Sequence, residues 1–369
     1  MRQPISRWKR REQSPWLVRG SWYGREVQRA AIDHWQHLGT SLRRTAEVLR
    51  SWLGRQERWQ LWRPLDSVPP EAEQCHLGSS TVQRWLDRAG VAAQGTVAGQ
   101  LAEVPTSGQV GTDGLWAKLR RGGKAVLLAL TDSVSGVVWP PVVVAAEHEA
   151  GWKRLGERAF AAGLKREELR GVTSDGAVGL VGYLEQVLEW VNHQRCVWHL
   201  WRNLGGELAR RVSEAATGLV GAAALAVRDK TRRELMALVR GVLDARSEVE
   251  AAAALAALRA HRLGAGLAQA LAADLDGALV HLLPYNPGLV RVGPEWLWRD
   301  FRLRLSRGRN HGSSHRLERA ALVWAIYRNF TPAQDRSERK RHYRRPGRSP
   351  LVQAGVPPGA VSYLDALGI

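Results

Sequence analysis

Two aspartates, Asp113 and Asp175, each precede a glycine, in the segments Gly-Thr-Asp-Gly and Thr-Ser-Asp-Gly. Carboxylates that converge in space can hold a pair of divalent ions, which activate the nucleophile and stabilise the leaving oxygen when a phosphodiester is cut. Magnesium prefers oxygen ligands and keeps several waters, so a few carboxylates suffice. Because Asp-Gly is also a common turn pair, either aspartate by itself indicates only a turn.

Short apolar runs rich in Val, Leu and Trp surround the first aspartate. They are separated by Arg-Arg-Gly-Gly and Ser-Val-Ser-Gly, and they predict a three-stranded antiparallel meander. A helix, a strand, a second helix and a fifth strand are predicted next, and this order is that of an RNase H-like α/β fold. The expected strands are 109–116, 124–131, 137–144, 171–174 and 195–198, and the expected helices are 151–162 and 178–191.

The predicted strands give both aspartates a functional placement. Asp113 falls inside the first apolar strand, where an acid is costly unless it is paired or bound to a metal. Asp175 directly follows the fourth strand, and the carboxyl ends of strands are where α/β sheets bind their ligands. Together, the two positions favour a metal site over two unrelated turns.

Residues 204–282 are rich in Ala and Leu and are predicted to be helical throughout. Apolar residues there keep helical spacing, as in Leu235, Leu238, Val239, Val242 and Leu243. We therefore expect an all-helical insertion, 204–300, within the α/β domain. A last long helix, 314–328, is expected after it, with Ser313 or Ser314 as its cap.

The N-terminal region, 24–90, is predicted to contain short helices with one apolar face each. The expected helices are 25–37, 42–53 and 81–89, the last ending at Gly90. This arrangement resembles a helix-turn-helix module. We expect Arg84 and Arg88 of the third helix to contact DNA, although a helical bundle that only supports the next domain has the same pattern. A basic arm, 1–23, precedes this region and a polar linker, 91–108, follows it.

A C-x-x-H motif, Cys196 to His199, follows the second aspartate. An aspartate on the first strand, an Asp-Gly after the fourth and then this motif resemble Mutator-like transposases and their bacterial insertion-sequence relatives. The resemblance implies a DDE-type, RNase H-like catalytic domain in two parts, 109–203 and 301–335, separated by the helical insertion. It also implies a catalytic glutamate on the last helix.

Glu318, near the start of that helix, is the glutamate to which the resemblance points. The resemblance then implies that Asp113, Asp175 and Glu318 are the catalytic residues and hold two Mg²⁺ or Mn²⁺ ions. Relatives often carry an asparagine pair before this glutamate, where this chain has Ser313, Ser314 and His315. A surface glutamate would fit the helix equally well, and Glu295 is the alternative third acid.

The cysteine and histidine of the C-x-x-H motif are also the types of residue that bind zinc. A mononuclear zinc site needs two further ligands, and only Cys75 and His76, in another predicted domain, are of the right kind. We therefore expect a structural role for the motif, with Cys196 buried and His199 bonding near the metal site.

The chain has 369 residues, which predicts two or three domains, and a formal net charge of +19 with a pI near 11.0. So basic a chain indicates a polyanionic partner, most commonly nucleic acid. The excess is mostly arginine, which suits DNA contacts but also follows from a GC-rich genome. A basic C-terminal tail, 336–369, includes Arg339, Lys340 and Arg341, which we expect to bind DNA.

Two cysteines exclude a disulfide framework, and no apolar run is long enough to predict a membrane span. We expect a protein of the bacterial cytosol, associated with the nucleoid, that works as a homo-oligomer on DNA. The resemblance implies an enzyme that binds terminal inverted repeats, hydrolyses a strand and joins the freed end to target DNA. The alternatives are a domesticated, non-catalytic DNA-binding regulator and an RNase H-like nuclease that never joins strands.

Overall fold

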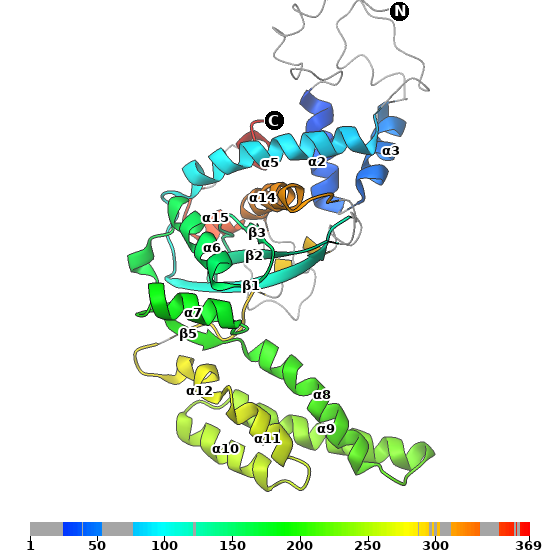
Figure 1. Cartoon of the computed structure of the whole chain (residues 1–369), viewed down its shortest axis with the longest axis vertical. Coiled ribbons are helices and arrows are strands. Elements are labelled where there is room, and N and C mark those ends of the chain that lie inside the picture. The colour runs from blue at the N-terminus through cyan, green and yellow to red at the C-terminus, as the bar shows by residue number, and fades with distance from the viewer. Residues whose placement is uncertain are drawn as a thin grey trace, which may run out of the picture.

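A mixed five-stranded sheet lies at the centre of the chain, and an all-helical lobe extends beyond one edge of it (Figure 1). The computed structural model describes residues 25–38, 40–53, 77–120, 123–286, 288–294, 297–298, 301–302, 311–332, 347–357, 359 and 362–369. The basic arm 1–23, Cys75, His76, Glu295, Arg339, Lys340 and Arg341 lie outside the described residues. Within them, no helix has the length and apolar character needed to cross a membrane.

The sheet combines an antiparallel meander with two parallel strands. Its order is β3-β2-β1-β4-β5, with β2 antiparallel to β1 and β3, and β4 parallel to β1 and β5. The predicted meander is therefore confirmed, although the third strand is shorter than expected. The strands are β1 (Gln109–Lys118), β2 (Lys124–Asp132), β3 (Val142–Val144), β4 (Gly171–Ser174) and β5 (Asn192–Arg195).

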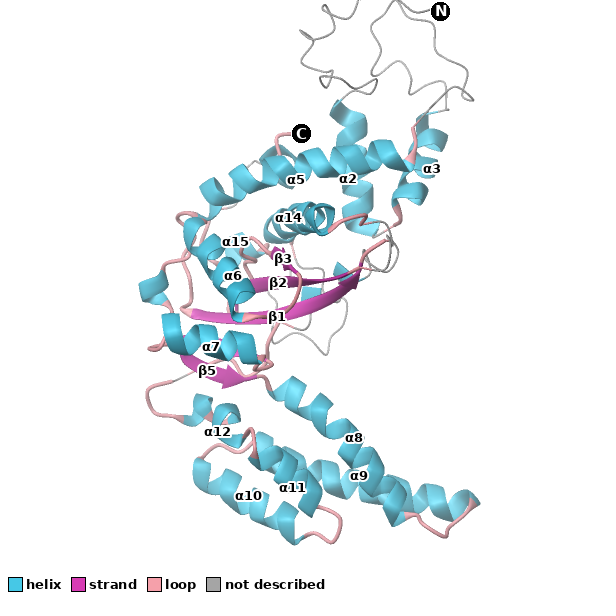
Figure 2. Cartoon of the chain, viewed as in Figure 1, coloured by secondary structure: helices cyan, strands magenta, loops and turns pink. Residues whose placement is uncertain are grey.

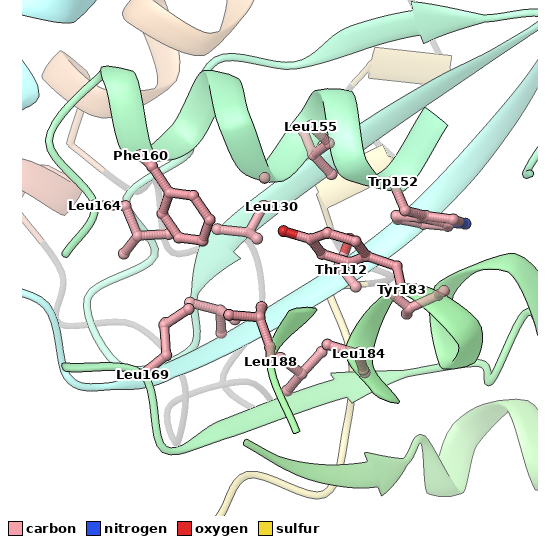
Figure 3. Close-up of a pocket in the computed structure, with 14 residues that line it drawn as sticks. Thr112, Leu130, Trp152, Leu155, Phe160, Leu164, Leu169, Tyr183, Leu184 and Leu188 are labelled. Carbon is pink, nitrogen blue, oxygen red and sulfur yellow. The ribbon is translucent and has the colours of Figure 1, made fainter. Parts of the chain in front are cut away.

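Two helices, α6 (Glu149–Ala161) and α7 (Val178–Val187), make the connections between the later strands and pack against each other. Figure 3 shows Phe160 and Leu155 of α6 gathered with Tyr183 of α7 over the sheet. The cavity between them is about 20 Å³ and is lined almost entirely by apolar atoms, so it holds one water at most. We regard it as a packing void of the core rather than a ligand site.

The position of the fifth strand differs from the prediction of 195–198. The strand is Asn192–Arg195, and the helix α8 (Val197–Ala215) begins two residues later. The apolar residues after Arg195 belong to that helix, where Val197 and Leu200 pack in the core of the helical lobe. The strand itself is polar because its inward residue, Gln194, binds the insertion by donating to Ala278 O and accepting from His281 N.

The predicted insertion contains only helices among its described residues (Figure 2). It starts earlier than expected, because α8 already belongs to it. Its buried core is a cluster of its own, and includes Leu235, Val239, Val242 and Leu243 at the predicted spacing. The other elements are α9 (Gly221–Leu243), α10 (Glu248–Ala260), α11 (Ala265–Ala272), α12 (Leu275–Ala278) and the 3₁₀ turn η3 (Val280–Leu282).

The N-terminal helices α2 (Arg25–Leu38), α3 (Leu42–Leu53) and α5 (Ser79–Leu101) share one buried core with the sheet and with α14 (Ser314–Phe330). The predicted linker, 91–108, is wrong over its first part, because α5 runs on to Leu101. Gly90 does not end this helix. A Cβ at Gly90 would overlap Arg319 of α14, so the glycine permits the two helices to approach closely.

The C-terminal residues pack on the fold rather than forming only a free basic tail. The short helices α15 (Pro350–Gln353) and α16 (Tyr363–Ala366) contact α14. Tyr363 donates a hydrogen bond of 2.6 Å to Asp33 of α2, and Arg29 pairs with Asp365 at 2.7 Å. The predicted tail 336–369 is therefore corrected for its described part, because apolar residues there join the common core.

Candidate metal centre

Asp113, Asp175 and His199 lie together at the edge of the sheet where β1, β4 and β5 point their carboxyl ends. One ligand atom of each lies within 4.8 Å of the other two, and Asp113 and His199 are each 4% exposed. The register explains the pairing: Gly111 lies opposite Thr173 in the parallel strands, so two residues further on the two aspartates stand side by side. The sequence predicted that the two aspartates converge, and the structure shows that His199 lies with them.

The loop that carries Asp175 is held from two sides. Its carboxylate accepts a hydrogen bond of 3.1 Å from the amide of Ala177, which closes a turn over Gly176. Gly176 has a φ of 76°, and a Cβ there would collide with the guanidinium of Arg195. Arg195 donates to the carbonyl of Asp175 and pairs with Asp274 of the insertion at 3.1 Å. This arginine therefore ties the helical lobe to the aspartate loop.

The C-x-x-H motif spans the junction of β5 and α8, with Cys196 as the N-cap and His199 in the first turn of the helix. Cys196 is buried, as expected, and its Sγ accepts a hydrogen bond of 3.1 Å from the amide of Gly293. Its own amide donates to Ser174 O at 2.7 Å, at the end of β4. The cysteine thus joins the return segment, which we define as residues 288–294 after the last helical turn of the insertion, to the site. The first turn of α8 directs the histidine to the aspartates.

Glu318 does not join this cluster. It is buried, as expected for a residue facing the sheet, but its carboxylate accepts from the amide of Val143 at 3.0 Å in the edge strand β3. Two arginines of α6 complete its surroundings, Arg154 at 3.0 Å and Arg158 at 2.7 Å. Because β2 lies between β3 and β1, Glu318 is about 10 Å from the strand of Asp113. The expectation that it converges with the aspartates is not met.

The return segment after the insertion passes directly beside β1. A Cβ on Gly111 would lie 2.9 Å from Cδ of Pro294, so the two backbones meet closely two residues before Asp113. Glu295, the alternative third acid, follows Pro294 in the sequence and lies outside the described residues.

Two ionisable groups near the cluster, Glu147 and His193, were not singled out from the sequence. Burial and the nearby Asp175 raise the pKa of Glu147, whose carboxylate sits over Gly114 and accepts from the side chain of Trp116. Burial and Arg195 lower the pKa of His193 to about 4, and its ring bonds to Ser174 Oγ at 2.8 Å. No motif marks either residue, because the loop before α6 and the polar strand β5 bring them there.

The donor set fits a divalent ion that accepts both oxygen and nitrogen ligands. Carboxylates suit Mg²⁺ and Mn²⁺, and an imidazole is acceptable to Mn²⁺ and to later transition metals. Asp175 and His199 come from two segments that are fixed by hydrogen bonds on both sides. The three ligand atoms therefore lie close enough together to serve one ion.

Comparison with known protein families gives a match that covers these residues. Residues 110–287 match the family model described as transposase, Mutator family, and no curated protein matches the chain. The matched stretch runs from β1 to the end of the insertion and contains Asp113, Asp175, Cys196 and His199. Over this stretch the chain is similar to transposases of the Mutator family.

Proposed function

We propose that the protein is a DDE-type DNA transposase that hydrolyses phosphodiester bonds at the ends of its element and transfers the freed strand into target DNA. The observation that carries this proposal is the cluster of Asp113, Asp175 and His199 inside the stretch that matches the Mutator-family transposase model. The order β3-β2-β1-β4-β5, with a meander followed by two parallel strands, supports an RNase H-like catalytic domain.

Asp113 and Asp175 are proposed as ligands of two Mg²⁺ or Mn²⁺ ions, with His199 completing the set of ligands on one side. Bound divalent ions would activate water or a 3′-OH and stabilise the leaving oxygen of the phosphodiester. The chain itself supplies orientation: the turn at Ala177 fixes one carboxylate, and the start of α8 fixes the imidazole. Cys196 holds the return segment against the site and needs no part in the reaction.

The third acid has two candidates, Glu318 and Glu295. Both oxygens of Glu318 are engaged by arginines and by a backbone amide, so it would have to leave these partners to bind a metal. Pro294, the residue before Glu295, lies against β1 near Asp113. Separate Glu318→Gln and Glu295→Gln variants assign the role, because only the true ligand loses Mn²⁺ affinity.

DNA binding is proposed for the N-terminal helices and for the basic tail. Arg84 and Arg88 are exposed on α5, which supports contact with phosphates of a terminal inverted repeat. The tail residues Arg339, Lys340 and Arg341 are proposed to contact DNA on the sequence alone. We also propose that the protein works as a homo-oligomer on DNA, in the bacterial cytosol and associated with the nucleoid.

The test is cleavage of DNA carrying the element ends, with Mg²⁺ or Mn²⁺, by the wild-type chain and by Asp113→Asn and Asp175→Asn. We expect each substitution to abolish cleavage while a gel shift shows unchanged DNA affinity. Full cleavage by both variants would end the proposal. Cleavage without strand transfer by the wild type would instead indicate an RNase H-like nuclease, and binding without any cleavage would indicate a regulator.

A further inference from the structure

Trp198 lies inside the C-x-x-H motif, yet it faces solvent. Its side chain is 41% exposed, whereas Cys196 and His199 on either side of it are buried. Other tryptophans of the described chain, including Trp139, Trp152, Trp298 and Trp324, are fully buried in the core. Exposure by itself is not unusual, since Trp116 and Trp190 are also exposed, but the place of Trp198 beside the candidate metal centre makes it a candidate for contact with a ligand.

The surroundings of this ring suit a nucleic acid. It meets the ring of His199 edge to face, with centroids 5.0 Å apart, so it is one side chain away from Asp113 and Asp175. Arg202, exposed one turn further along α8, places its guanidinium 5.2 Å from the centroid of the Trp198 ring. An aromatic face, a cation and a metal centre therefore follow one another along the start of one helix.

We propose that Trp198 and Arg202 form a binding site for an unpaired nucleobase beside the phosphate at the metal centre. This inference rests on the proposed transposase function, because it takes DNA as the ligand. A phosphate held by a metal ion at Asp113 and Asp175 would bring the base of its own or the next nucleotide within reach of the ring. Exposed aromatic rings stack on bases of any sequence, and arginine adds a contact to phosphate or base. A base inside a duplex has no free face, so the site selects DNA that is unpaired at this position.

The chain contains a matched control. Trp190 is 47% exposed, and the guanidinium of Arg166 lies 4.9 Å from its ring centroid, so it forms a similar exposed pair. Trp190 precedes β5, however, so it lies at the amino ends of the parallel strands, whereas the candidate metal centre lies at their carboxyl ends. A general effect of removing an exposed tryptophan would appear in both Trp198→Ala and Trp190→Ala. An effect of the proposed site would appear only in Trp198→Ala.

The test uses the full chain with Ca²⁺, a fluorescein-labelled oligo(dT), and a blunt duplex of mixed sequence. Fluorescence anisotropy measures both affinities, and a 2-aminopurine in the oligo(dT) reports stacking. We expect Trp198→Ala to weaken oligo(dT) binding by about tenfold and to abolish the 2-aminopurine quenching, while duplex affinity changes less than about twofold. Trp198→Phe should restore most of the binding, and Trp190→Ala should behave as the wild type. Thermal melting of each variant verifies the fold.

Wild-type affinity of Trp198→Ala for oligo(dT), or an equal loss for oligo(dT) and duplex, would overturn the inference. Equal losses in Trp198→Ala and Trp190→Ala would do the same. The outcome is separate from that of the catalytic proposal, because oligo(dT) binding and 2-aminopurine quenching are measured with Ca²⁺ and without cleavage, whereas the catalytic proposal is tested by cleavage with Mg²⁺ or Mn²⁺. A chain that stacks the base and never cleaves would retain this site and lose the proposed reaction.

Discussion

Replacement of Glu318 by glutamine separates a structural role of this residue from a metal-binding one. In the structure its carboxylate joins three elements: α14, which carries it, β3 through Val143, and α6 through Arg154 and Arg158. The isosteric Glu318→Gln change keeps the volume of the side chain and an acceptor for Val143. It removes the negative charge that faces the two guanidinium groups.

The expected loss of stability follows from the exposure of the partners. Breaking a fully buried ion pair by removing one charge costs about 3–5 kcal/mol. Here the glutamate is buried, but the side chains of Arg154 and Arg158 are 50% and 24% exposed and can be rehydrated. We therefore expect a decrease of about 2 kcal/mol in the free energy of unfolding, nearer the value for one hydrogen bond to a charged group.

Urea unfolding and Mn²⁺ titration calorimetry are the measurements, with Glu157→Gln as the control. Glu157 is an exposed acid on α6, so its neutralisation changes the charge of the same helix without touching the Glu318 cluster. We expect Glu318→Gln to be less stable and to bind Mn²⁺ as the wild type does, and Glu157→Gln to match the wild type in both. A Glu318→Gln protein of wild-type stability that binds no Mn²⁺ would refute this reasoning and make Glu318 a ligand.

Further expectations concern the helix contact, the metal centre and DNA. Gly90→Ala should destabilise the protein by more than about 1 kcal/mol, because the added Cβ would overlap α14. Gly95→Ala, on the same helix, adds a Cβ that meets no atom within 4 Å, so thermal melting should show a slight stabilisation. His199→Ala should lower Mn²⁺ affinity by more than about tenfold, and Asp113→Asn should abolish binding; unchanged calorimetric titrations would remove these residues from the metal site. Arg84→Ala should weaken DNA binding uniformly across sequences and reduce the salt slope by about one, and a loss confined to one sequence would instead indicate base contact.

Local patterns were sufficient for most of the elements. The strand around Asp113, the strand before Asp175 and the last helix with its cap at Ser313 lie where alternation, turn residues and capping predict them. These features depend on neighbours in the sequence, since strand alternation and helix caps are set by residues a few positions apart. The two aspartates were identified for the same reason, because Asp113 falls inside one predicted strand and Asp175 directly follows another.

Packing between distant segments decided the rest. Gly90 has the sequence character of a helix end, and only the approach of α14 makes it an interior residue. Glu318 has the sequence position that the resemblance gives to a third ligand, but in the fold its carboxylate is engaged by the arginines of α6 and the amide of Val143. His199 reaches the aspartates because α8 begins directly after β5, at the edge where the parallel strands end. A helix surface offers similar positions for a structural pair, a metal ligand and a close contact, and which of these a residue forms is set by the segment that packs against it.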